Sequence, residues 1–156
     1  KLFDFSAKVS YTKVELKVDT LLGSFTIDEK LDGIYKCINE SKLLKNLQDD
    51  WDEEGAIGCN YAVYDRAVNL LLKYAQNVLK YYGAVIQAPD INLTKDGSVD
   101  LEWSNANGIL LITVLNSLDF DAHYYGSDFK TGTIIKGALK NYTVNRNLSF
   151  WMQSLA

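Results

Sequence analysis

Proline, histidine and cysteine are scarce in this chain, and each scarcity narrows what the chain can be. Of its 156 residues, one is proline, one is histidine (His123) and two are cysteines (Cys37 and Cys59). A single histidine excludes a metal site built on two imidazoles. Two cysteines without a Cys-x-x-Cys spacing exclude a disulfide framework. Whether the two cysteines are bridged stays open, although Cys37 falls on the apolar side of an expected helix, as a small buried hydrophobe does.

The chain also lacks any long apolar run. The longest, residues 108–115, has the length of a strand and is far short of the roughly 20 residues that span a bilayer. We therefore expect no membrane partner and a cytoplasmic protein. Because the chain begins at Lys1 and not at a methionine, export after removal of an N-terminal segment stays open.

Motifs of phosphate binding and nucleophilic catalysis are missing as well. Neither G-x-x-x-x-G-K-[ST] nor G-x-G-x-x-G occurs, and there is no G-x-S-x-G turn. The net charge is −4, whereas nucleic-acid binders need a basic face to neutralise phosphates. We therefore expect no cofactor, and nucleic acid is an unexpected partner.

What remains is the composition of one globular domain over residues 1–156, with 47% hydrophobic and 23% charged residues. Two stretches have apolar residues at helical spacing. The first follows a capping-box pattern, Thr26-x-x-Glu29, and continues to residue 38. The second follows Asn60, a good N-cap, and ends before Gly83, a good C-cap.

Alternation of apolar and polar residues predicts strands at 99–103, 109–115, 119–125 and 131–136. Residues 109–115 are apolar on both faces, so this strand should be central. Short connections between these strands predict an antiparallel meander. Residues 3–25 predict short N-terminal strands, and residues 148–155 predict either a short helix or a last strand.

The predicted fold class is therefore α+β: two helices packed on one face of an antiparallel β-meander, with N-terminal short strands. The predicted core consists of Ile34, Leu44, Trp51, Ala67, Leu71, Tyr74, Val78, Leu101, Trp103, Leu111, Ile112 and Phe120.

The densest cluster of charge is the acidic loop, residues 47–56, which lies between the two predicted helices. It places carboxylates on both sides of Trp51, which we expect to be an inward anchor while the carboxylates face solvent. Residues 50–55 also match the first half of a calcium loop. Position twelve would be Tyr61, where that motif needs a bidentate glutamate, so we predict no metal site.

A second cluster falls on the meander. Asp100 and Glu102 share one face of their strand, and Asp119, Asp121 and His123 share one face of theirs. If the two faces coincide, the group could bind a metal or transfer protons. A sheet with one hydrated face produces the same alternation without any function, and we favour that interpretation.

The segment 123–126 is aromatic, and Phe129 follows closely. Aromatic rings at the rim of a loop often contact a partner. Alternatively, Tyr124 belongs to the core and Tyr125 covers the edge of the sheet.

We therefore expect a non-catalytic protein-interaction factor, of accessory or immunity type, whose partner is another protein. The alternative is a metal-dependent or hydrolase-like enzyme. The candidate binding residues are Asp50, Asp52, Glu54, Tyr124, Tyr125 and Phe129. The enzyme alternative would use Asp100, Glu102, Asp121 and His123.

Three segments occur in a suggestive order: Asp-Trp-Asp-x-x-Gly-Ala at 50–56, Asp-Gly-x-x-x-Leu-Glu-Trp at 96–103 and Tyr-Tyr-Gly at 124–126. The set resembles a group of small, uncharacterised bacterial proteins with a Trp-Asp-Gly-x-Gly-Ala-like segment before a helix. The resemblance covers residues 43–126. It departs at Glu53, where glycine is frequent in the group, and after Ala56, where a proline-rich start is usual. No activity is established for this group, so the resemblance implies a bacterial or phage origin.

Overall fold

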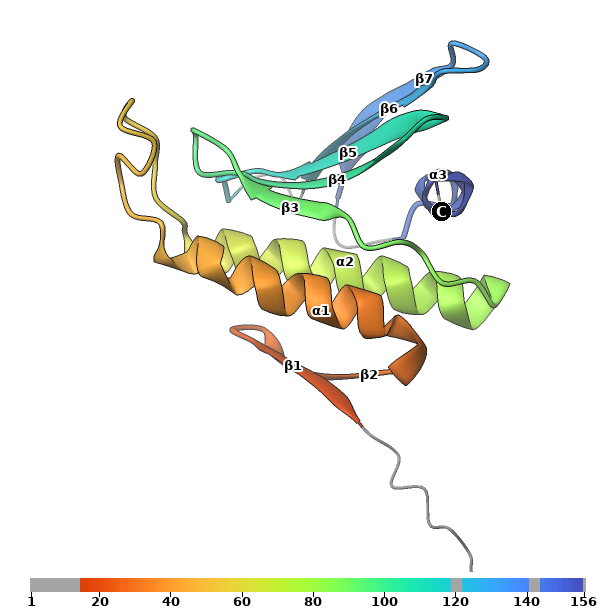
Figure 1. Ribbon diagram of the computed structural model, residues 1–156, viewed down its shortest axis with the longest axis horizontal. Helices are drawn as coiled ribbons and strands as arrows, with labels where there is room; N and C mark the ends of the chain where they lie inside the picture. Colours follow the sequence, from red (N-terminus) through yellow and green to blue (C-terminus); the bar gives the residue numbers. More distant parts are fainter. Residues whose placement is uncertain (1–14, 119–121, 141–143, 156) are drawn as a thin grey trace, which may run out of the picture.

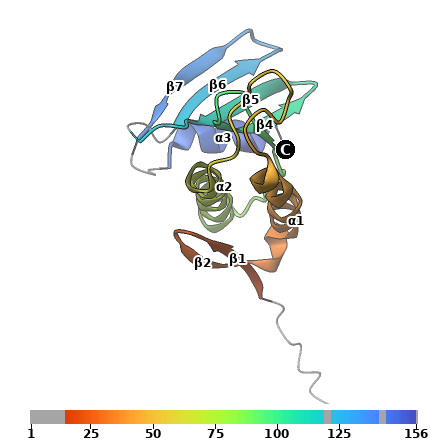
Figure 2. The ribbon, with the colours of Figure 1, turned by 90° about the vertical axis from the view of Figure 1, so that its left-hand side faces the viewer.

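The computed structural model describes residues 15–118, 122–140 and 144–155. A five-stranded antiparallel sheet, a pair of helices and a two-stranded hairpin lie in three successive layers (Figure 1). A third helix lies on the same side of the sheet as the pair (Figure 2). This arrangement confirms the predicted α+β class, with helices on one face of an antiparallel meander and short N-terminal strands.

The strands are β1 (Leu16–Thr20), β2 (Gly23–Ile27), β3 (Asp90–Leu93), β4 (Val99–Asn105), β5 (Gly108–Val114), β6 (Ala122–Asp128) and β7 (Ile134–Leu139). The helices are α1 (Asp32–Ser41), α2 (Tyr61–Tyr82) and α3 (Arg146–Ser154), with short 3-10 helices at Glu29–Leu31 and Lys42–Asn46.

The first helical segment begins later than predicted. Thr26 does not cap a helix, because it belongs to β2 and pairs with Lys17 across the hairpin. The chain turns helical only after Asp28, whose side chain accepts a hydrogen bond of 2.9 Å from the backbone N–H of Lys30. The capping-box prediction is therefore wrong, because the threonine of the motif is part of a paired strand.

Both predicted ends of α2 are confirmed. The Asn60 side chain accepts from the N–H of Ala62 at 2.9 Å, and Gly83 ends the helix in the left-handed conformation at φ 62°. The sheet covers one side of α2 and the β1–β2 hairpin the other (Figure 1). α2 is consequently buried on more than the one face that the sequence pattern indicated. No helix among the described residues is both long and apolar enough to cross a membrane.

The sheet has the order β3-β4-β5-β6-β7, and every neighbouring pair is antiparallel. β5 is the central strand, as predicted from the apolar residues on both of its faces. β3 was not predicted; it directly follows Pro89, the single proline of the chain.

The last two strands extend further toward the C-terminus than predicted. β6 continues through Asp128, and residues 119–121 lie outside the described residues. The carboxylate of Asp128 then accepts from the N–H groups of Lys130 (2.8 Å) and Thr131 (3.2 Å), which forms the turn. β7 begins only after this turn.

Most of the predicted core is confirmed. Leu44 and Trp51 are half-buried against the core, and Leu111 is a correction because it lies on the opposite face of β5. Phe120 lies outside the described residues. The confirmed buried residues are Ile34, Ala67, Leu71, Tyr74, Val78, Leu101, Trp103 and Ile112.

Cys37 and Cys59 are both free thiols. The Cys37 thiol donates to the carbonyl of Pro89 at 3.1 Å, which joins α1 to the start of β3. Burial raises the pKa of this thiol to about 11, so it stays protonated and unreactive near neutral pH.

Candidate interaction surface

In the structure the acidic loop extends to Gly58, and its tryptophan holds it in place. The Trp51 indole packs against the core, and its Nε1 donates to the carbonyl of Ile57 at 3.0 Å. The ring is half-buried, so the expected inward anchor is present but remains partly exposed to solvent.

Asp49, Asp50, Glu53 and Glu54 are exposed, as expected for this segment, whereas Asp52 is half-buried. Asp49, Asp50 and Asp52 each turn a carboxylate oxygen back onto backbone N–H groups of the loop. The N–H of Ala56, followed by that of Glu54, holds the pKa of Asp52 below its usual range. The donors are the N–H groups of Gly55 (2.8 Å, to Asp50), Glu54 (2.9 Å, to Asp52), Ala56 (3.0 Å, to Asp52) and Gly58 (2.8 Å, to Asp49).

Backbone geometry closes the same loop. Asp50 and Glu53 have left-handed φ angles of 66° and 61°. A Cβ added at Gly58 would lie 2.8 Å from the backbone of Gln48 and Asp49, so only glycine fits there. From the β3–β4 turn, Lys95 forms an ion pair with Glu54, and its Nζ lies 3.6 Å from a carboxylate oxygen of Asp52. The loop is a closed structural unit in which three aspartates accept from backbone N–H groups and Glu54 pairs with a lysine.

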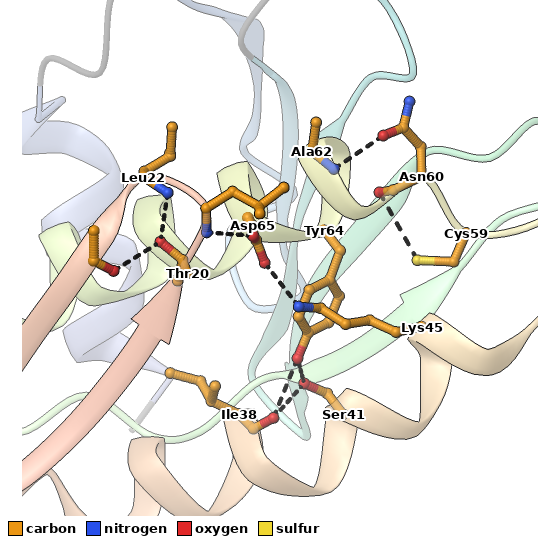
Figure 3. A network of polar contacts seen from close by, with 12 residues as sticks. Thr20, Leu22, Ile38, Ser41, Lys45, Cys59, Asn60, Ala62, Tyr64 and Asp65 are labelled. Atoms are coloured by element: carbon orange, nitrogen blue, oxygen red, sulfur yellow. Dashed lines mark hydrogen bonds and ion pairs between the residues drawn. The ribbon is translucent and has the colours of Figure 1, made fainter.

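A buried carboxylate lies at the base of this loop, and the sequence analysis missed it. Asp65 on α2 is only 1% exposed. It accepts from the N–H of Leu21 at 2.7 Å and lies 3.2 Å from the ammonium of Lys45 (Figure 3). The Lys45 ammonium in turn lies 5.3 Å and 4.9 Å from the ring centroids of Tyr61 and Tyr64. One feature of the sequence could have indicated this burial. α2 is apolar on several faces, as is typical of a helix covered on both sides, so a charged residue such as Asp65 within it can be buried.

The opposite, outer face of the five-stranded sheet turns away from the helices (Figure 1). Side chains paired across neighbouring strands share a face, so the strand register gives its rows directly. The three rows are Asp100-Thr113-His123-Ala138, Glu102-Leu111-Tyr125-Lys136 and Ser104-Ile109-Ser127-Ile134.

Three residues of the enzyme alternative, Asp100, Glu102 and His123, share this face but do not form one cluster. Thr113 of β5 separates Asp100 from His123, and its hydroxyl donates to the Asp100 carboxylate at 2.6 Å. Burial raises the pKa of Asp100. Asp121 lies outside the described residues. Within residues 15–118, 122–140 and 144–155, no three His, Cys, Asp or Glu side chains are grouped so that they could hold a metal ion.

The predicted aromatic group is divided between the two faces. Tyr124 points to the helix side, where its hydroxyl would lie 2.6 Å from a Cβ added at Gly137 of β7. Tyr125 is 41% exposed on the outer face, and Phe129, in the turn after β6, is 58% exposed. Of the two interpretations, Tyr124 therefore follows the core one, whereas Tyr125 and Phe129 remain accessible.

The candidate binding residues also lie at two ends of the molecule. The acidic loop, with Asp50, Asp52 and Glu54, lies beside the β3–β4 turn, whereas the β6–β7 turn lies at the other end of the sheet (Figure 1). The structure therefore does not join these two sets into one site.

Apolar side chains gather on the outer face from β5 across β6 to the start of β7, those of β5 being half-buried. We call the group Ile109, Leu111, Tyr125 and Ile134 the outer patch; Ile134 is 57% exposed. Glu102 flanks it on the β4 side and Lys136 on the β7 side. None of the described helices or strands covers this patch (Figure 2). Comparison with family models, curated proteins and solved structures finds no match for this chain.

Proposed function

We propose that this chain is a non-catalytic protein-interaction factor, of accessory or immunity type, that binds its partner with the outer patch. The observation that carries the proposal is the combination of an apolar centre and an uncovered sheet face. A hydrated sheet face is normally polar, so there is little reason for Ile109, Leu111 and Ile134 to lie there unless another surface covers them.

The surroundings of the patch support the same function. Specific protein interfaces combine an aromatic and aliphatic centre with a polar, charged rim. Here Tyr125 supplies a large ring, and Glu102 and Lys136 supply opposite charges at the two sides. The resemblance to bacterial proteins implies a bacterial or phage source for this factor.

Two earlier candidates remain predictions beside this proposal. Asp50, Asp52 and Glu54 could contact a partner at the other end of the molecule, chiefly through the exposed Glu54. The enzyme alternative requires that the protein turns over a substrate and that this activity is lost in His123→Ala or Asp121→Ala.

Site-specific photo-crosslinking in the expressing cells tests the proposal. A benzophenone amino acid replaces Tyr125 in one variant and Tyr81, an exposed tyrosine on α2, in the control; Tyr81 is 66% exposed. We expect position 125 to capture a discrete protein that position 81 does not. No capture at position 125, or the same proteins at both positions, would contradict the proposal.

A further inference from the structure

β7 is an open edge of the sheet, whereas the other edge strand is covered. β3 lies next to α1 and is tied to it through the Cys37 thiol and the Pro89 carbonyl. β7 ends the strand order, and no described helix or strand lies along its outer side (Figure 2). An edge strand presents a row of backbone N–H and C=O groups with which another extended chain can pair.

The charge of this edge is opposite to that of the whole chain. Residues 129–140 contain Lys130, Lys136 and Lys140 but no aspartate or glutamate, although the net charge of the chain is −4. The covered edge is acidic instead, with Asp90 on β3 opposite Glu102 on β4. An extended segment with acidic side chains therefore complements β7 and is repelled by β3.

The outer face of β7 also defines which side chains an added strand would present. Ile134, Lys136 and Ala138 alternate along this face, next to the row that contains Tyr125. An added strand places alternate side chains beside these three residues. Acidic residues would lie near Lys136, and apolar residues would extend the outer patch from Ile134 across the new strand.

Building on the proposed function, we infer that β7 pairs with an extended, acidic and apolar segment of the partner protein, which adds a sixth strand to the sheet. A second copy of this chain is a poorer occupant. Continuous antiparallel pairing of two β7 strands, with both outer faces on one side, sets the two Lys136 side chains opposite or diagonally across from each other.

The test uses a fluorescein-labelled peptide of alternating valine and glutamate, with fluorescence anisotropy as the readout. We expect this peptide to bind the whole chain, whereas a valine–lysine peptide and a valine–glutamate peptide with alternate N-methylated amides do not. Lys136→Glu should weaken binding by about tenfold or more. Lys17→Glu, a matched change at an exposed strand lysine of β1, should change binding less than about twofold.

Amide hydrogen exchange locates the bound peptide. We expect β7 amides to gain protection when the valine–glutamate peptide is added. Binding without that protection, equal effects of the two lysine variants, or no peptide binding at all would overturn strand addition. A dimer whose β7 amides are protected without peptide would overturn it in favour of self-pairing. If the crosslink at position 125 persists while the peptide fails, the protein-interaction proposal survives and only strand addition is lost.

Discussion

The acidic loop and the β6–β7 ribbon (residues 122–139) are the two regions whose side chains predict contact with a partner, yet they use those side chains differently. In the loop, Asp49, Asp50 and Asp52 accept hydrogen bonds from the loop's own N–H groups. In the ribbon, Tyr125 and Lys136 face outward on an uncovered sheet. A dense cluster of charge therefore does not identify a binding site. The distinction depends on whether the polar groups already have partners within the fold.

The largest effect is expected at the base of the acidic loop. Asp65→Ala leaves the Lys45 ammonium without its ion-pair partner and the Leu21 N–H without its acceptor. We expect the free energy of unfolding to fall by about 3–5 kcal/mol in urea titrations. Asp32→Ala, which removes an exposed ion pair with Lys36, is the control and should leave stability nearly unchanged. Equal losses in the two variants would show that burial of Asp65 has no energetic consequence.

The anchor of the loop comes next. Trp51→Ala should lower the free energy of unfolding by about 2–3 kcal/mol, less than the ~3–5 kcal/mol of a fully buried ring, because the indole is half-buried. Trp51→Phe keeps most of the packing but removes the Nε1 donor to Ile57, so it should recover more than half of the loss. An unchanged melting temperature in Trp51→Ala would mean that the ring is not an anchor.

Two glycines sharpen the comparison between loop and ribbon. A Cβ at Gly58 meets backbone at 2.8 Å, which cannot move without opening the loop, so Gly58→Ala should cost about 1–3 kcal/mol of stability. A Cβ at Gly137 meets the far end of the Tyr124 side chain at 2.6 Å, and that side chain can shift. Gly137→Ala should therefore lower the stability less than Gly58→Ala does, with both variants measured by thermal melts. The reverse order would contradict the rigidity assigned to the loop.

The smallest effect is on the pH dependence of stability. Backbone N–H groups lower the pKa of Asp52 in the folded chain, so its stabilisation is present above the unfolded pKa, about 4, and is lost as the pH falls through the folded value. Burial raises the pKa of Asp100, so its contribution has the opposite sign and is lost as the pH rises through the folded value.

Urea titrations from about pH 3 to pH 6 measure this difference. Asp52→Asn should flatten the loss of stability toward acid, whereas Asp100→Asn should steepen it. Identical pH profiles for wild type and Asp52→Asn would show that the Asp52 carboxylate does not bond the loop amides in solution.

The sequence predicted those parts of the fold that depend on local pattern. Alternation around Leu101 and Trp103 identified the meander, and Asn60 and Gly83 delimited α2 correctly. It failed where tertiary pairing decides. Thr26 pairs within the β1–β2 hairpin and therefore does not cap a helix. The second buried face of α2, which contains Asp65, depends on contact with this same hairpin, which is distant in sequence.

The candidate site was predictable to a similar degree. Alternation correctly placed Asp100 and Glu102 on one face, but it left open whether Tyr124 belongs to the core. It could not show that β5 intervenes between Asp100 and His123, because strand order is not a local property. It also could not show which aspartates would fold back onto the N–H groups of their own loop, since that requires the left-handed residues Asp50 and Glu53.

Residue-resolved amide hydrogen exchange of the free protein tests the contrast between loop and ribbon most directly. We predict that the N–H groups of Gly55, Ala56 and Gly58 exchange slowly, because each donates to an aspartate of the loop, while alternate N–H groups of β7 exchange quickly. Fast exchange at these three loop amides together with uniform protection along β7 would contradict the account.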